Sequence, residues 1–363
     1  MSIRTSLLVR PWRVAACAGA LLAAATALLT GATALRAQAE PSAVARHVAA
    51  AKAAAGTQWQ GLFGVLCETP AAAAAAQPPA AVAAAPPAVA PAPPAPPSSP
   101  PDRAQWYAEP VQVFDNLYYV GMTEYSAWAV TTSAGIILVD TLYDYSVEAE
   151  VVQGLRKLGL DPHSIKYAIV SHGHGDHSGG APYLQDTFGT KIVLAAADWE
   201  LLERGKGARP RRDVVASDGM ALTLGDTTLR LYLTPGHTLG TLSTVIPLKD
   251  HGRPHVAVTW GGTAFNWLKN RDDYITAKRP DAFWFRHYVE SAQRFAGIAA
   301  RAHADVLLSN HTIFDGSKAK LPLLRARTAE QPHPYVVGSA SVQAYLTVAR
   351  ECAQAGLARL PQR

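Results

Sequence analysis

Short apolar runs separated by polar turns predict a series of β-strands from residue 111 onward. The segment 135–140 is a continuous apolar run that ends in an acidic residue, and 165–170 is mostly apolar, which is typical of strands covered on both faces. Other predicted strands are 111–113, 117–120, 127–131, 191–195, 227–233, 242–247 and 305–308. The segments that we expect to be helical are 145–158, 197–204, 281–302 and 341–360. Strands flanked by helices in this order predict an α/β layered fold.

The first 39 residues are typical of a secretory signal peptide. An N-terminal region with arginines precedes a long apolar stretch, and Ala37-Gln38-Ala39 is a cleavage sequence, so that the mature chain would begin at Glu40. We therefore expect a periplasmic protein without stable membrane insertion. The apolar stretch approaches the length of a membrane span, so an uncleaved anchor stays open as an alternative.

Three further segments follow residue 39. Residues 40–68 form an Ala-rich N-terminal extension that we expect to begin as a helix. Residues 69–101 form an Ala/Pro-rich linker, whose composition cannot build a packed core. Residues 102–363 contain nearly all the aromatic and charged residues and form the catalytic domain.

Charge argues against a nucleic-acid partner. The 363 residues have a formal net charge of +5, and removal of the four arginines in residues 1–39 leaves +1. A nearly neutral protein has no general attraction for polyanions. Hydrophobic residues make up 49% of the chain, which is enough for a full core and excludes a disordered protein.

Export also bears on the cysteines. Cys17 lies in the signal peptide, which leaves Cys67 and Cys352 as a possible pair in an oxidising compartment. A disulfide between them would tie the N-terminal extension to the last helix. Two unpaired, buried thiols are the alternative.

The strongest candidate site is His172-Gly-His174-Gly-Asp176-His177, directly after the predicted strand 165–170. Crowded imidazoles repel one another when protonated and are costly to bury without partners, whereas a divalent cation removes both problems. One tetrahedral ion cannot use all four side chains and keep an open position, so the spacing predicts two ions. His237 and His311 also follow predicted strands and are the candidates for the remaining ligands.

The HxHxDH cluster, the later Gly-His-Thr sequence and a third His after an apolar strand resemble the metallo-β-lactamase superfamily over about residues 105–360. The resemblance implies an α/β fold, an αβ/βα four-layer sandwich with two mixed sheets and helices outside. It implies two Zn²⁺ ions, the first bound by His172, His174 and His237, the second by Asp176, His177 and His311. Asp140 would orient one of these ligands through a hydrogen bond, and a strand cap is its alternative role.

Further comparison favours one subclass. Glyoxalase II-like and lactonase-like members have a metal-bridging Asp near the position of Trp260, but no Asp occurs between Asp250 and Asp272. The Cys ligand of the first metallo-β-lactamase subclass and the Asn of the second are also missing. The chain therefore resembles the third subclass, whose two sites use only His and one Asp.

This resemblance implies zinc-dependent hydrolysis of the β-lactam amide bond of antibiotics by a metal-bound hydroxide, which gives resistance. Asp176 would have a catalytic role by accepting a hydrogen bond from the hydroxide. Thr263 and Asn266 are candidates for binding the carboxylate of the β-lactam, and hydrogen bonding within their loop is the alternative. The alternative functions are a related hydrolase acting on a lactone, thioester or other ester, and a metal-binding protein without activity.

Overall fold

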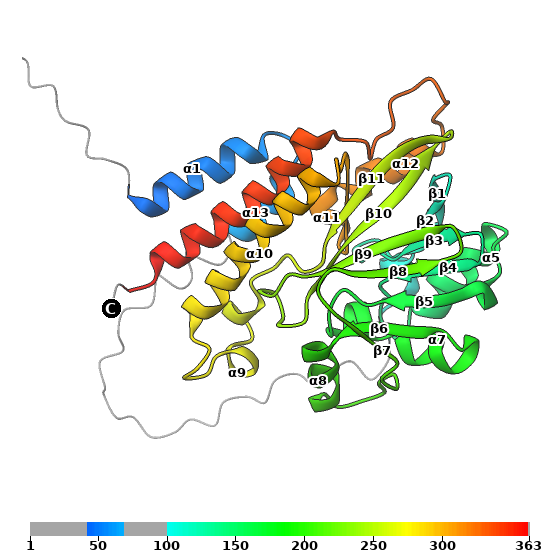
Figure 1. The fold of residues 1–363 in the computed structure, drawn as a ribbon, viewed down its shortest axis with the longest axis horizontal. Helices are drawn as coiled ribbons and strands as arrows, with labels where there is room; N and C mark the ends of the chain where they lie inside the picture. The colour runs from blue at the N-terminus through cyan, green and yellow to red at the C-terminus, as the bar shows by residue number, and fades with distance from the viewer. Residues whose placement is uncertain (1–41, 69–99, 362–363) are drawn as a thin grey trace, which may run out of the picture. The chain divides into compact units, whose positions relative to one another are not determined.

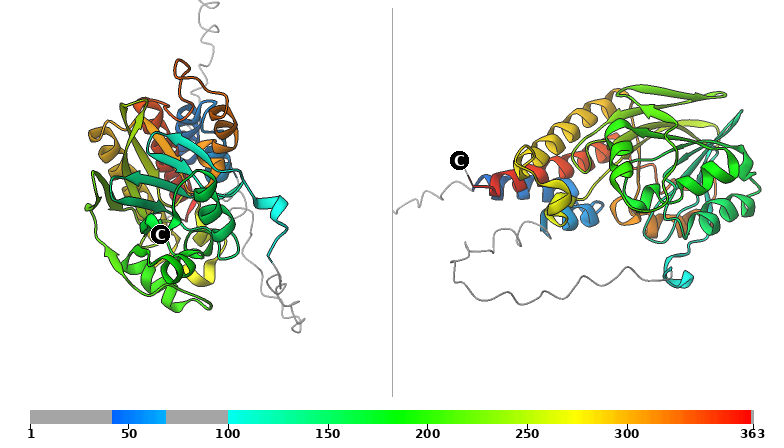
Figure 2. Two further views of the ribbon diagram at one scale, coloured as in Figure 1. Left: turned by 90° about the vertical axis from the view of Figure 1, so that its right-hand side faces the viewer. Right: turned by 90° about the horizontal axis from the view of Figure 1, so that it is seen from below.

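The computed structural model describes residues 42–68 and 100–361. The predicted signal peptide 1–39 and most of the linker 69–101 therefore lie outside the described residues. Two β-sheets face each other, and helices cover their outer faces (Figures 1 and 2). The predicted αβ/βα sandwich is confirmed.

The first sheet brings the ends of several strands to one edge. Its seven strands are arranged in chain order: β1 (Val111–Phe114), β2 (Leu117–Tyr119), β3 (Trp128–Thr132), β4 (Gly135–Val139), β5 (Ile165–Ile169), β6 (Lys191–Ala195) and β7 (Val214–Ala216). Strands β4 to β7 are parallel to one another. The residues that directly follow β4, β5 and β6 therefore lie at a common edge of the sheet.

The second sheet has the order β12-β11-β10-β9-β8. Its strands are β8 (Met220–Leu224), β9 (Thr227–Leu233), β10 (Leu242–Asp250), β11 (Arg253–Trp260) and β12 (Val306–Ser309). Strands β8 to β11 are antiparallel neighbours, while β12 is parallel to β11. The segments that follow β9, β11 and β12 consequently leave the sheet on the same side.

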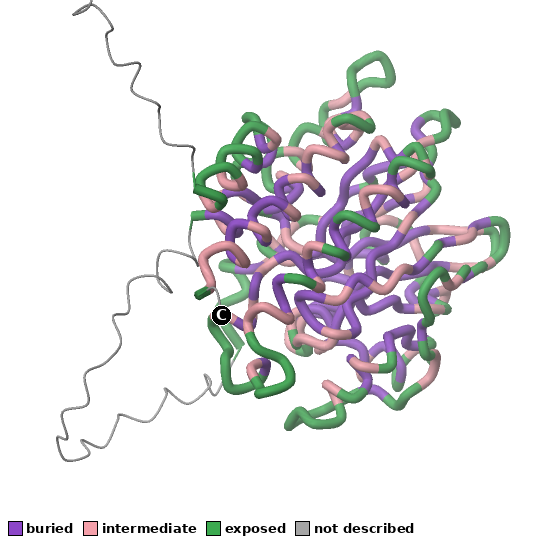
Figure 3. Tube along the Cα trace, turned by 60° about the vertical axis from the view of Figure 1, so that its left-hand side comes forward, coloured by how far each residue is buried: buried purple, intermediate pink, exposed green. Residues whose placement is uncertain are grey.

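Alternating side chains along a strand pack in two different layers, the core between the sheets and the core beneath the helices. In β4, Ile137 and Val139 belong to the core between the two sheets, whereas Ile136 and Leu138 pack against the helices outside. The same division explains why β4 is apolar along its whole length. Buried residues concentrate in the centre and exposed residues in the outer turns (Figure 3).

The helices outside the first sheet differ in one place from the sequence-based expectation. They are α4 (Arg103–Trp106), η2 (Glu148–Val152), α5 (Gln153–Lys157), η3 (Pro162–Ser164), α6 (Gly175–Ser178), α7 (Ala181–Phe188) and α8 (Ala196–Arg204). The single helix expected for 145–158 is a π-helical turn, η2, continued by α5. This wider turn includes a buried carboxylate, Glu150, which accepts a hydrogen bond from Ala108 N.

The helices associated with the second sheet include those of the N-terminal extension. They are α1 (Ala43–Ala55), α2 (Gln60–Phe63), η1 (Gly64–Glu68), η4 (Asn266–Leu268), α9 (Arg271–Tyr274), α10 (Asp281–Arg301), α11 (Thr312–Asp315), α12 (Ser317–Leu324) and α13 (Ser339–Arg359). Helices α1, α10 and α13 lie side by side (Figure 1), and their buried residues share one core. The predicted disulfide between Cys67 and Cys352 is confirmed.

Candidate metal centre

The six predicted ligands lie together at the edge where the strands of both sheets end. His172, His174, Asp176 and His177 follow β5, whereas His237 follows β9 and His311 follows β12. In two groups of residues, the ligand atoms are close enough together to hold a metal ion. One group is His172, His174 and His237, and the other is His172, Asp176 and His177. The structure therefore brings together residues that are up to 139 positions apart in the chain, and their role as ligands stays a prediction.

The first three histidines, His172, His174 and His237, form a tightly packed trio. The Nε2 atom of His237 lies 3.0 Å from Nε2 of His172 and 3.1 Å from Nδ1 of His174. On the other side of their rings, Nδ1 of His172 lies 2.8 Å from the Gly261 carbonyl, and Nδ1 of His237 lies 2.6 Å from the Ala264 carbonyl. A carbonyl oxygen only accepts hydrogen bonds, so both Nδ1 atoms carry the proton.

The charge state of this trio favours a bound cation. Burial holds the pKa values of His172 and His237 well below the usual range, and it lowers the pKa of His174 to about 4. All three rings are therefore neutral at pH 7, and the Nε2 atoms of His172 and His237 present lone pairs to each other. Facing lone pairs repel unless a cation lies between them, and this donor set fits a zinc-type ion.

The other three residues, Asp176, His177 and His311, form a more polar trio. The Nε2 atom of His177 lies 3.1 Å from Asp176 Oδ2 and 3.2 Å from His311 Nε2, and Asp176 Oδ2 lies 3.5 Å from His311 Nε2. Burial opposes charge on His177, but Asp176 and Asp140 outweigh it and raise its pKa to about 10. Burial likewise opposes charge on Asp176, but His177 and His311 hold its pKa well below the usual range. A metal ion at this trio would have to displace the second proton of His177.

Asp140 lies where the resemblance places it. Its Oδ2 is 3.0 Å from His177 Nδ1, and its Oδ1 accepts a hydrogen bond from Ser171 N. The carboxylate thus fixes the ring of His177 and the start of the loop that carries the histidines. Asp140 also has a positive φ of 65°, a strained conformation that Asp tolerates better than most residues.

Three residues that support the site were not found from the sequence. Asp198 in α8 is buried and accepts hydrogen bonds from Gly173 N, Gly240 N and Thr238 Oγ1. It therefore joins the loop of His172 and His174 to the loop of His237. Tyr274 Oη lies 2.6 Å from His174 Nε2, and Asn310 Nδ2 donates to the Gly261 carbonyl. Asp198 is one of three acidic residues in α8, with Glu200 and Glu203, and nothing in the sequence distinguished it from the other two.

The two candidates for substrate binding lie in different environments. Asn266 is half-buried, and its Nδ2 lies 3.4 Å from His237 Nε2 and 3.5 Å from His174 Nδ1, so it borders the first trio. Thr263 is 2% exposed, and its buried hydroxyl has no hydrogen-bond partner among the described residues. The structure thus brings Asn266 to the cluster and places the side chain of Thr263 in the core beneath it.

Comparison with known proteins agrees with this geometry. Residues 120–251 match the family model of the metallo-beta-lactamase superfamily. Among solved structures, BJP-1, a subclass B3 metallo-beta-lactamase of Bradyrhizobium japonicum, is 27% identical with a TM-score of 0.56, over 66% of this chain and 90% of that one. The metallo-beta-lactamase FEZ-1 from Legionella gormanii is 25% identical with a TM-score of 0.56, over 66% of this chain and 91% of that one.

A curated relative has a different name. A hydroxyacylglutathione hydrolase of Acidiphilium cryptum is 29% identical over 114 residues, which are 31% of this chain and 41% of that protein. The chain therefore spans only about two fifths of the length of this relative. Together, these comparisons and the two facing sheets show that the chain has the metallo-β-lactamase fold and that residues 120–251 are a domain of the metallo-β-lactamase superfamily.

Proposed function

We propose that this protein is a periplasmic dizinc hydrolase that opens the β-lactam amide bond of antibiotics and so gives resistance. The observation that carries the proposal is the donor set, which consists of five imidazoles and one carboxylate converging at one edge of the sandwich. One ion would be held by His172, His174 and His237, and the other by Asp176, His177 and His311. The likeness to subclass B3 enzymes supports the substrate class.

When bound, zinc would supply Lewis-acid activation of a water molecule and of the carbonyl under attack. The protein's own residues supply orientation. Gly261, Ala264 and Asp140 fix the rings of His172, His237 and His177 from behind, so that each presents one nitrogen to the centre.

Asp176 has an additional role in this proposal. Its contacts with His177 and His311 both use Oδ2. Its Oδ1 can therefore accept a hydrogen bond from the attacking water. This hydrogen bond would orient a lone pair of the water oxygen toward the substrate carbonyl. Asn266, at the rim of the first trio, can donate from Nδ2 to an oxygen of the substrate.

A thioester or lactone hydrolase is the second candidate, because a hydroxyacylglutathione hydrolase is among the relatives. The loop after β11 argues against it. This loop has glycine at 261 and 262, and a Cβ at Gly262 would lie 2.5 Å from Cβ of His237. No carboxylate could extend into the centre from that position, and the side chain of the next residue, Thr263, is buried.

Hydrolysis by the purified chain from Glu40 onward tests the proposal. The substrates are a penicillin, a carbapenem, a homoserine lactone and a glutathione thioester, each with and without a chelator, with His237→Ala as the matched inactive control. We expect β-lactam turnover that the chelator abolishes and zinc restores. Turnover of the lactone or thioester without any β-lactam turnover would contradict the proposal.

The proposed location has its own test. None of the helices in the described part of the chain is long and apolar enough to cross a membrane. We expect the full chain, expressed in a Gram-negative host, to be released with the periplasmic fraction and to begin at Glu40. An intact N-terminus in the membrane fraction would support an uncleaved anchor instead.

A further inference from the structure

We propose that the described part of the N-terminal extension, residues 42–68, is a positioning element for His311 and thereby for the second metal site. This inference rests on the proposed role of His311 as a ligand. It goes further in assigning a task to a segment that lies outside the residues matched by the family model.

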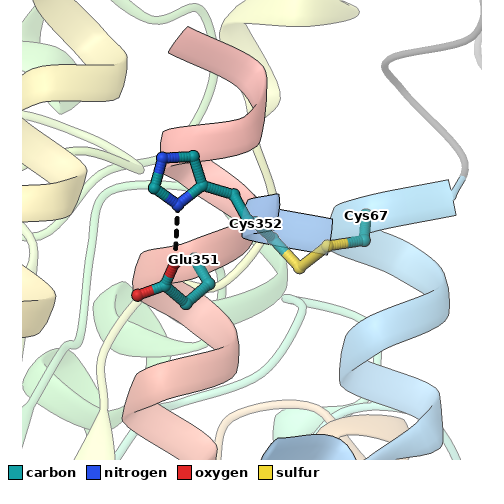
Figure 4. The surroundings of a disulfide bond; sticks show 4 residues. Cys67, Glu351 and Cys352 are labelled. Atoms are coloured by element: carbon teal, nitrogen blue, oxygen red, sulfur yellow. Dashed lines mark hydrogen bonds and ion pairs between the residues drawn. A yellow bond between two sulfur atoms is a disulfide. The ribbon is translucent and has the colours of Figure 1, made fainter. Parts of the chain in front are cut away.

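The extension is fixed on α13. Trp59 Nε1 donates a hydrogen bond to the Ser341 carbonyl at 3.0 Å, and the Trp59 ring meets Tyr345 edge-on with centroids 5.2 Å apart. At the end of the extension, Cys67 in η1 is joined to Cys352 in α13 (Figure 4). Because α13 packs along α10 and the second sheet, the extension has a rigid support.

The extension also packs closely against α11. A Cβ at Gly61 would lie 2.5 Å from the carbonyl oxygen of Ile313, so that only glycine allows this approach of the two backbones. Phe314 is buried in the same core as Leu62, Phe63 and Leu66 of the extension. Lys320 in α12 adds a further contact, because its ammonium group lies 5.3 Å from the centroid of the Trp59 ring.

Helix α11 begins at the residue after His311, and contacts on both sides hold the imidazole. The ring centroids of His311 and Phe314 are 5.4 Å apart, and those of His311 and Tyr125 are 5.0 Å apart. The next residue, Thr312, donates hydrogen bonds from N to the Glu124 carbonyl and from Oγ1 to the Thr123 carbonyl. His311 is thus held between residues 123–125 and the surface that the extension supports.

His311 depends on packing more than the other histidines do. His172, His174, His177 and His237 each have an oxygen atom at the ring nitrogen that faces away from the centre. Within residues 42–68 and 100–361, no such oxygen partner of His311 is found. Its orientation is therefore set by Tyr125 and Phe314, and the position of Phe314 is set by the extension.

Substitution of Gly61 with alanine tests the inference. The new Cβ must displace either α11 or the extension, and Trp59 and the disulfide hold the extension in place. The matched control is Gly64→Ala in the same segment, where the nearest atom to a Cβ is a carboxylate oxygen of Glu68 at 3.9 Å. The probe is Zn²⁺ alone, titrated into chelator-treated mature chain in competition with a chromophoric chelator.

We expect Gly61→Ala to bind the second zinc ion about tenfold or more weakly, while the first ion binds as in the parent chain. Gly64→Ala should bind both ions like the parent. Equal weakening of both ions, or no weakening, would overturn the inference. If Gly61→Ala fails to fold, Phe314→Leu serves instead, because it keeps an apolar side chain but loses the ring contact with His311.

The same titration separates this inference from the proposed function. If the parent chain binds fewer than two ions, or if His311→Ala still binds two, the proposed ligand assignment fails. If two ions bind, His311 is required for one of them, and Gly61→Ala and Phe314→Leu leave both affinities unchanged, only the role of the extension fails.

Discussion

The two halves of the candidate centre are built from the same kind of side chain but are held in different ways. In the first half, His172 and His237 are 1% and 4% exposed, and each ring is bonded to a carbonyl of the loop after β11. In the second half, His177 forms a buried ion pair with Asp140, whereas the His311 side chain is 26% exposed and is held by neighbouring rings. Hydrogen bonds near the ligands fix one half, and a remote segment of the chain supports the other.

The largest expected effect comes from removing one ligand of each half. His237→Ala removes the residue whose Nε2 lies near both other nitrogens of the first trio, and we expect kcat/KM to fall by more than about 10³-fold. His311→Ala leaves the first trio intact, so it should keep one zinc ion and retain more activity. Elemental analysis with β-lactam kinetics measures both, and loss of both ions from His311→Ala would break the comparison.

Asp198→Asn should damage the first half without touching a ligand. Asp198 accepts from two backbone N–H groups and one hydroxyl, and whichever way the amide of Asn turns, its NH₂ faces a backbone donor. The unsatisfied buried donor should cost about 2–3 kcal/mol of stability. Loosened loops should lower kcat/KM by about 10–100-fold. Asp186→Asn, at an exposed ion pair, is the control and should change neither quantity appreciably.

The contrast between the halves also explains which parts of the fold and of the site could be predicted from the sequence. The strands and most helices follow from apolar runs and helical spacing, and the ligand cluster from six consecutive residues after β5. Asp140 closes an apolar strand, and its role as a residue that orients a ligand is implied by the family resemblance. Asp198, Tyr274 and Asn310 could not be assigned, because each acts on a partner distant in the sequence and their surroundings show no pattern. The support of His311 by Gly61 and Phe314 depends on the packing of helices, which residue spacing does not encode.

The disulfide should affect stability more than the metal centre. It joins residues 285 positions apart, and in the loop-entropy model such a bond contributes about 5 kcal/mol. Cys67→Ser with Cys352→Ser should therefore lower Tm by about 5–10 °C. The buried contacts of Leu62, Phe63 and Leu66 remain, so zinc content and turnover at 25 °C should stay nearly unchanged.

Reductant should reproduce this change in the parent chain and have no effect on the double variant. Two free thiols in the unfolded, non-reduced parent would contradict the bond. A selective loss of the second zinc ion below Tm would show that the bond itself, rather than the packing, positions the extension.

Glu150 provides a reference outside both halves, and its substitution should affect the centre least. Burial raises its pKa to about 8, so between about pH 4.5 and 8 the folded chain keeps a proton that the unfolded chain has lost. The free energy of unfolding should therefore fall as pH rises through this range and level off above it.

The Glu150→Gln side chain can still accept a hydrogen bond from Ala108 N, and it carries no charge at any pH. We expect the variant to lose this part of the pH dependence, to be more stable than the parent by about 2 kcal/mol or more at pH 8, and to keep the parent's kcat/KM and zinc content. Denaturant unfolding of both proteins at pH 5 and pH 8 measures the difference, and parallel changes in the two proteins would refute this role of Glu150.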